Sequence, residues 1–216
     1  MTDSLSVVNS TPDMVEQLER IQRVSFPSLD EASLITAAHY RAHIDRFPEG
    51  QFAVVDGDGQ VVACSTDYRA HVDFDHYEHR YLEAVDHNWL SHHDPHGEWL
   101  YGVDIGVLPA YRRRGIARML YHARRDLIHR LRLRGHVAGG MLVGYGQYKD
   151  QMSVETYVNR VKAGTLFDPT VSVQLKIGFT IHGILHDYVD DPSCDNKAVF
   201  LVWHNPAYAA SSPASS

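Results

Sequence analysis

The sequence predicts an α/β fold, with a mixed, mostly antiparallel sheet of about seven strands flanked by helices. Three observations lead to this prediction. Short apolar runs of β-forming residues recur along the chain, amphipathic stretches with helical spacing separate some of them, and 44% of the 216 residues are hydrophobic. That hydrophobic content suits one domain with a sizeable core.

The first expected elements are a strand and two helices. Residues 5–8 form a short apolar run. Residues 10–13 then open a helix, because they offer a hydroxyl cap, a proline in the first turn and an acid near the positive end of the helix dipole. A second helix is expected over 31–46, and it ends where Pro48 pushes the preceding residue out of helical geometry.

A hairpin and an insertion follow. Residues 52–55 and 61–65 are β-type runs, and the stretch 56–59 between them alternates aspartate with glycine, which is typical of a turn. Residues 71–97 are rich in histidine, aspartate and aromatic residues. We interpret them as an insertion that is partly helical around 78–85.

The second half of the chain begins with a long strand over 99–107. In the helix after it, apolar residues repeat at helical spacing from Ile116 to Leu131, and Gly135 ends it. The other expected elements are a strand over 136–143, a helix over 153–164, a turn or helix end over 175–179, and strands over 180–189 and 198–204. Residues 1–206 are thus expected to form a single domain, and the Ala- and Ser-rich residues 207–216 a disordered tail.

Composition excludes several classes of function. The formal net charge of −7 argues against nucleic acid as a partner, because phosphate binding needs a basic face. No apolar run approaches the roughly 20 residues that cross a bilayer. The first ten residues also lack the features of a signal peptide, so we expect a cytoplasmic protein without a membrane partner. Cys64 and Cys194 form neither a disulfide framework nor a metal motif.

The segment over 107–117 has the features of a phosphate site. A buried strand ends there, a turn follows and an amphipathic helix begins. The first N–H groups of a helix have no internal partners and carry the positive end of the dipole, so they bind diphosphates well. Gly115 has no Cβ and Ala117 is small, so a phosphate can approach the backbone closely. The three arginines over 112–114 add positive charge.

This segment resembles motif A of the GNAT acetyltransferases, in which [QR]-x-x-G-x-[GA] follows a strand that ends in V-x-P. The order of the elements also resembles that superfamily. Further segments resemble a bacterial subgroup in which the acetyltransferase domain is often fused to a carbon–nitrogen hydrolase domain: Phe47-Pro48-Glu49-Gly50-Gln51-Phe52, Trp99-Leu100-Tyr101-Gly102, 133–140, Asp168-Pro169, Gln174-Leu175 and Gly178-Phe179. We expect no hydrolase domain within these residues.

The resemblance implies an N-acetyltransferase that moves an acetyl group from acetyl-CoA to a primary amine by direct attack. The amine would belong to a small molecule or a peptide, and the protein could form a homodimer. The central strands would splay at a bulge, so that the backbone of Ile105 and Val107 pairs with the pantetheine arm. The implied cofactor-binding residues are Ile105, Val107, Arg112, Arg113, Arg114, Gly115, Ile116 and Ala117.

The residues that would act as general base for the amine and general acid for the leaving thiolate are less well defined. Asp104 is an acid within an apolar strand, where a carboxylate is either functional or paired with an arginine or backbone groups. Glu98 is the weaker candidate for a base. Many superfamily members use the tyrosine of Y-x-x-x-G-F as acid, but Gln174 stands at that position here. Tyr145 and Tyr148 follow the next strand and are the alternative acids, unless solvent protonates the thiolate.

Seven histidines gather in the insertion. Histidine and carboxylate suit transition metals, but no helical pair of ligands stands out, so we assign no metal and interpret the segment as a solvated or pocket-lining loop. One of these histidines could also serve as a base. Two alternatives to the enzyme remain open: an acyl-CoA-binding sensor or scaffold without turnover, and a subunit that works beside a separate hydrolase.

Overall fold

The computed structural model describes residues 4–209, and their centre is one seven-stranded sheet. Its strands follow the order β1-β2-β3-β4-β5-β7-β6, and only β4 and β5 pair in parallel. The strands are β1 (Ser6–Asn9), β2 (Gln51–Val55), β3 (Val61–Ala70), β4 (Trp99–Val107), β5 (Gly135–Met141), β6 (Thr180–Leu185) and β7 (Ala198–His204). The predicted mixed, mostly antiparallel sheet is therefore confirmed.

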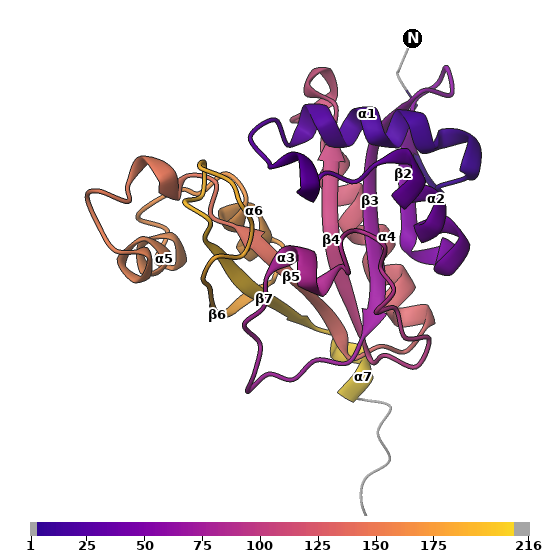
Figure 1. Ribbon diagram of the computed structural model, residues 1–216. Helices are drawn as coiled ribbons and strands as arrows, with labels where there is room; N and C mark the ends of the chain where they lie inside the picture. Colours follow the sequence, from indigo (N-terminus) through magenta and orange to yellow (C-terminus); the bar gives the residue numbers. More distant parts are fainter. Residues whose placement is uncertain (1–3, 210–216) are drawn as a thin grey trace, which may run out of the picture.

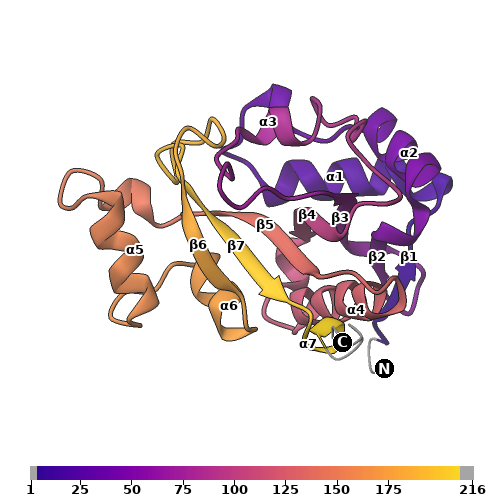
Figure 2. The ribbon, with the colours of Figure 1, turned by 90° about the horizontal axis from the view of Figure 1, so that it is seen from below.

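Helices cover both faces of the sheet (Figure 2). On one face lie α1 (Val15–Ser25), α2 (Ala37–Arg46) and the short α3 (Tyr81–Ala84), and on the other lie α4 (Ile116–Arg130) and α6 (Val171–Lys176). Helix α5 (Val154–Lys162) packs against α6, beyond the β6 edge. None of the helices within residues 4–209 has the length and apolar character that a membrane span requires.

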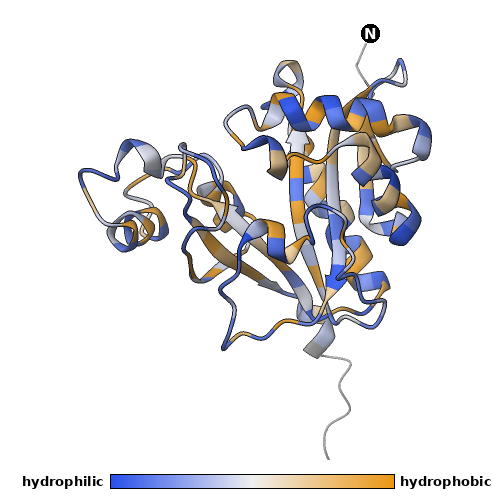
Figure 3. Cartoon of the chain, in the orientation of Figure 1, coloured by the Kyte–Doolittle hydropathy of each residue, from blue (hydrophilic) through white to orange (hydrophobic). Residues whose placement is uncertain are grey.

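The apolar core has two parts, one on each side of the β4–β5 junction. The first joins α1, α2 and α4 to β2 and β3, around fully buried residues such as Leu18, Val62 and Leu120. The second is rich in tyrosine and joins β5–β7 to α5 and the insertion. In Figure 3, α1 alternates hydrophilic and hydrophobic residues, as expected for a helix with one face on the sheet.

The central strands separate at the middle of the sheet. Pairing between β4 and β5 runs from Trp99 opposite Gly135 to Gly102 opposite Ala138 and goes no further. Beyond this point β4 stays with β3, whereas β5 stays with β7, and Figure 1 shows the two halves diverging. A register shift leaves Val103 as an extra residue of β4, which is a β-bulge. The predicted splay is thus confirmed.

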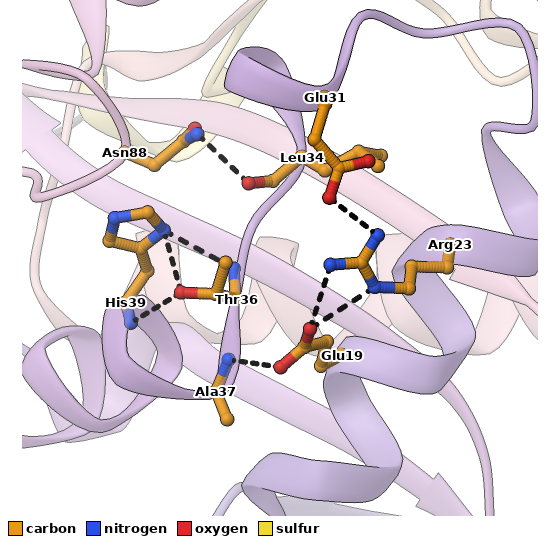
Figure 4. Close-up of polar contacts among 8 residues, drawn as sticks. All are labelled: Glu19, Arg23, Glu31, Leu34, Thr36, Ala37, His39 and Asn88. Atoms are coloured by element: carbon orange, nitrogen blue, oxygen red, sulfur yellow. Dashed lines mark hydrogen bonds and ion pairs between the residues drawn. The ribbon is translucent and has the colours of Figure 1, made fainter.

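The connection between α1 and α2 differs from the prediction of a helix from residue 31. Helix α2 begins at Ala37, because Thr36 caps it and forms a capping box with His39. The Glu19 carboxylate on α1 also accepts a hydrogen bond from the Ala37 amide at 2.8 Å. Figure 4 shows these contacts, together with the Asn88 amide of the insertion, which donates to the Leu34 carbonyl at 3.3 Å. The insertion thereby fixes the segment before α2.

Two boundaries near the C-terminus also differ. Strand β6 ends at Leu185 rather than at 189, because Asp187 has a left-handed φ of 50° and turns the chain. Residues Pro206–Ala209 form the short helix α7, where a disordered tail from 207 was expected. The Asn205 side chain stabilises the start of α7, because its Oδ1 accepts a hydrogen bond from the Ala207 amide at 3.0 Å. The rest of the expected tail, 210–216, lies outside the described residues.

Candidate active site

The turn between β4 and α4 is open to a ligand. Gly115 is the cap residue of α4, with a left-handed φ of 80°, and no side chain caps the helix in the described structure. A Cβ added at Gly115 would meet no atom within 4 Å. Ile116 next to it is buried and anchors the first turn. The first amides of α4 therefore face open space, in the geometry that binds phosphate.

The three arginines of the turn are exposed and lie at the same end of β4. The Arg112 Nε donates to the Val107 carbonyl at 3.2 Å. The Arg114 guanidinium lies 5.2 Å from the centre of the Tyr111 ring. The turn and its arginines thus bring the expected cofactor-binding residues of this segment together.

The backbone of β4 turns an edge without a strand partner toward the splay, although the Val107 carbonyl accepts from Arg112 Nε. The Leu108 amide donates to the Val62 carbonyl, so this residue faces the β2–β3 side of the sheet. Because successive residues of a strand point their amides to opposite edges, Val107 and Ile105 face the β5 side. No β5 residue pairs with them. These are the two residues expected to pair with a pantetheine arm.

A groove with positive side chains continues along α4. It has a volume of about 350 Å³ and lies between α4 and the turn after α6. Arg118, Arg125 and Lys176 line it. The Arg125 guanidinium donates to the Ile177 carbonyl and lies 4.8 Å from the centre of the Trp203 ring, so it is fixed in place. The groove extends the positive potential of the turn.

A small pocket occupies the splay on the opposite face of the sheet. Its volume is about 40 Å³, and Asp104 of β4 is part of its lining. The other lining residues come from α1 and its C-terminal loop, the two splayed strands, the insertion and the β6–β7 loop: Gln22, Phe26, Leu29, Tyr81, Val103, Gly139, Met141, Tyr188 and Val189. The pocket is thus mostly apolar and aromatic, with one carboxylate.

Asp104 is buried with one of its oxygens unused. The residue is only 8% exposed, and Oδ2 accepts a hydrogen bond from Tyr40 Oη at 3.3 Å. Oδ1 has no hydrogen-bond partner. Burial raises the pKa of Asp104 to about 6, although the Arg124 guanidinium partly opposes the shift. A carboxyl group that lines a pocket, has a pKa near neutrality and has one oxygen without a hydrogen-bond partner can accept a proton.

Arg124 holds the bulge beside Asp104. This buried residue of α4 donates to the backbone carbonyls of Asp104 at 2.6 Å and Thr66 at 3.1 Å. Its Nε donates to the Asp67 carboxylate at 2.9 Å. The bulge disturbs the regular strand pairing around these carbonyls, and the guanidinium supplies the missing donors. The apolar periodicity of this helix gave no indication of this role.

Tyr188 of the β6–β7 loop is a site residue that the sequence prediction missed. Its backbone is fixed by two hydrogen bonds. The Tyr188 amide donates to the Asn196 carbonyl at 2.8 Å, and the Tyr188 carbonyl accepts from the Tyr81 amide at 2.7 Å. Its ring covers Gly139, where an added Cβ would lie 2.2 Å from the hydroxyl. The pair Gly139-Gly140 inside a strand was the available signal, because glycine there often marks a close approach.

The model of the acetyltransferase (GNAT) family matches residues 15–139, more than half of the chain. The protein belongs to this family. Among curated proteins, the uncharacterized N-acetyltransferase YkwB of Bacillus subtilis (strain 168) is 30% identical over 211 residues, which cover 97% of this chain and 93% of YkwB. The probable hydrolase YhcX of the same organism is 32% identical over 198 residues, which cover 90% of this chain and 37% of YhcX. The chain therefore spans little more than a third of YhcX.

The solved structures agree with this assignment of the fold. The GNAT-like decarboxylase GphF, in complex with isobutyryl-CoA, superposes with a TM-score of 0.74 over 93% of this chain and 99% of that one, at 19% identity. As a GNAT family member, the protein is an acyltransferase that takes its acyl group from an acyl-coenzyme A. The resemblance identified from the sequence is thereby confirmed.

The expected acids of this GNAT protein lie elsewhere. The Tyr145 hydroxyl donates to the Met152 carbonyl at 3.3 Å. The rings of Tyr145 and Tyr148 both pack against Tyr157 of α5. Neither lines the pocket with Asp104. Their assignment as proton donors stays a prediction that the geometry does not favour. Gln174, which replaces the family's tyrosine, donates to Tyr121 Oη at 3.2 Å.

Glu98 lies just before β4, and four histidines of the insertion gather around another pocket. Glu98 pairs with Arg134 at 3.0 Å before β4 begins. This second pocket, of about 350 Å³, is lined by His71, His76, His79 and His92. No group of three or more ligand side chains within residues 4–209 has the arrangement of a metal site. The pocket-lining interpretation of this loop agrees with the structure.

Proposed function

We propose that this GNAT protein is an N-acetyltransferase that moves the acetyl group of acetyl-CoA to a primary amine by direct attack. The observation that carries the proposal is the position of the Asp104 carboxylate. It lies in a pocket at the splay of β4 and β5, with one oxygen free, on the strand that leads to the phosphate-binding turn.

The chain fits the cofactor at three points. The amides of Gly115, Ile116 and Ala117 would hold the pyrophosphate, because they open α4 toward empty space. The arginines of the turn, 112–114, would add charge for the phosphates. The outward edge of Ile105 and Val107 would bind the pantetheine arm as an added strand, and this would bring the thioester to the splay.

The pocket favours the end of a slender amine. A volume of about 40 Å³ holds a small group only, so a chain with a terminal amino group fits and a branched one does not. Two residues that line the pocket each have a buried oxygen without a hydrogen-bond partner, Asp104 Oδ1 and Gln22 Oε1. Buried acceptors need donors, and the N–H groups of an amine supply them. Aromatic rings of Phe26, Tyr81 and Tyr188 also favour a cationic group.

Asp104 is the proposed base. Alkylamines are protonated at neutral pH, because their pKa is about 10, and must lose protons to act as nucleophiles. With a pKa of about 6, the Asp104 carboxylate is ionised at pH 7 and can accept one, directly or through a water.

The test is to measure thiol release from acetyl-CoA against a panel of amines, beside the affinity for coenzyme A. We expect turnover on unbranched primary amines and much less on amines branched next to the nitrogen. Tight binding of acetyl-CoA without turnover on any amine would instead support a sensor or scaffold without catalysis.

A further inference from the structure

A row of hydrogen-bonded side chains joins the two pockets on this face of the sheet. Tyr188 Oη lies 3.3 Å from Tyr101 Oη, and Tyr101 Oη lies 2.7 Å from His79 Nε2. Tyr188 lines the small pocket with Asp104, whereas Tyr101 and His79 line the second, larger pocket. Both tyrosines are buried, and His79 is partly exposed.

The direction of these hydrogen bonds follows from the other nitrogen of His79. His79 Nδ1 lies 2.7 Å from the Tyr77 carbonyl, which can only accept, so Nδ1 carries the hydrogen. In the neutral ring Nε2 is then the acceptor, and Tyr101 donates to it. Because the Tyr101 hydrogen is used, Tyr188 donates to Tyr101. All hydrogens of the row therefore point toward His79, and Tyr188 Oη keeps its capacity to accept a further hydrogen bond.

The proposed reaction needs two routes for protons. An ammonium has three N–H bonds and the amide product has one, so two protons leave the nitrogen. One ends on the sulfur of coenzyme A and the other is released. The hydrogen bond of Asp104 leads inward to Tyr40, which contacts the buried Cys64 at 3.8 Å. Asp104 is therefore suited to move a proton within the pocket and not to release it.

We propose that Tyr188, Tyr101 and His79 form a proton relay that carries the released proton from the substrate ammonium to the second pocket. The inference rests on the proposed function. The ammonium proton passes to Tyr188 Oη, the Tyr188 proton to Tyr101 Oη, and the Tyr101 proton to His79 Nε2. The imidazolium then gives its Nε2 proton to water in the second pocket, so that Nδ1 keeps its hydrogen on the Tyr77 carbonyl, and the two hydroxyls turn back. Only N–H and O–H bonds break and form, and no group is oxidised.

The surroundings of the three groups suit these roles. Burial lowers the pKa of His79 below its usual 6.5, so the ring is neutral and can accept a proton at pH 7, although Glu83 partly opposes the shift. Burial raises the pKa of Tyr188 to about 12 and the pKa of Tyr101 well above its usual value, so neither hydroxyl is ionised at rest. The other titratable groups that line the second pocket are His71, His76, His92, Asp73, Asp94, Tyr68 and Tyr77.

The first test removes the central hydroxyl. Tyr101→Phe keeps the ring, and Tyr68→Phe is a matched control, because Tyr68 is a buried neighbour at 5.0 Å whose hydroxyl donates outside the row, to Ala84. We expect kcat/KM for the amine to fall at least about 10-fold in Tyr101→Phe, with the affinity for coenzyme A unchanged. Tyr68→Phe should stay within about two-fold of the wild type. Equal rates for the two variants would overturn the relay.

The second test is the pH profile, which a purely structural role would not change. The wild type needs both His79 and Asp104 deprotonated, so log kcat/KM should rise with a slope approaching two on the acid side. In His79→Gln the glutamine side chain can still accept a hydrogen bond from Tyr101, but it does not titrate. The acid-side slope of log kcat/KM should therefore fall to one in this variant. An unchanged slope would rule out His79 as the terminal acceptor. Absence of thiol release by the wild type would overturn the proposed function and the relay together, whereas normal turnover by Tyr101→Phe overturns the relay alone.

Discussion

Replacing Gly115 by valine separates cofactor binding from folding, because the chain offers a matched position. Gly115 and Gly164 are both exposed, both have left-handed backbones, with φ of 80° and 70°, and a Cβ at either would meet no atom within 4 Å. Valine in this conformation costs about 1–2 kcal/mol. Gly115→Val and Gly164→Val should therefore lose similar stability in urea unfolding.

Their affinities for coenzyme A should differ widely. The valine side chain at 115 would fill the space that the pyrophosphate needs. Loss of two hydrogen bonds to a charged phosphate costs about 3–6 kcal/mol, which corresponds to at least about 100-fold weaker binding. Isothermal titration with coenzyme A measures this loss directly. Gly164→Val should bind like the wild type, and a Gly115→Val variant that also binds normally would refute the phosphate assignment.

Three further outcomes are expected. Asp104→Asn should lose at least about 100-fold in turnover while it binds coenzyme A normally, and full activity would remove Asp104 as the base. Arg124→Met should lower the free energy of unfolding by about 3–5 kcal/mol in urea, because it leaves the Asp67 carboxylate buried without its partner; a loss below 1 kcal/mol would contradict that pairing. Gly139→Ala should displace the Tyr188 ring and reduce kcat, and a crystal structure with the ring in place would count against this.

The sequence predicted the parts of this protein that depend on local patterns. Strand and helix order follows from apolar periodicity, and the open turn that we propose as the phosphate site follows from a glycine between arginines and a helix. Each of these patterns lies within about ten consecutive residues of the sequence. The start of α2 was misplaced, because the cap at Thr36 and the contact from Glu19 depend on how α1 packs beside it.

The parts that were missed depend on contacts between distant segments. Tyr188 reaches the splay only because the β6–β7 loop folds over Gly139, and His79 meets Tyr101 only because the insertion packs on β4. Arg124 looked like one of several helix arginines, yet its position opposite the bulge buries it. Asp104 could be named as a candidate base from the sequence because an acid in an apolar strand is unusual in itself, and the structure places it in the lining of a pocket.

The most direct measurement of the central claim is a crystal structure with coenzyme A and an acetylated amine. The pyrophosphate oxygens should lie within hydrogen-bond distance, about 2.7–3.2 Å, of the amides of Gly115–Ala117, and the sulfur should lie at the splay of β4 and β5. Coenzyme A bound away from the start of α4 would contradict the account.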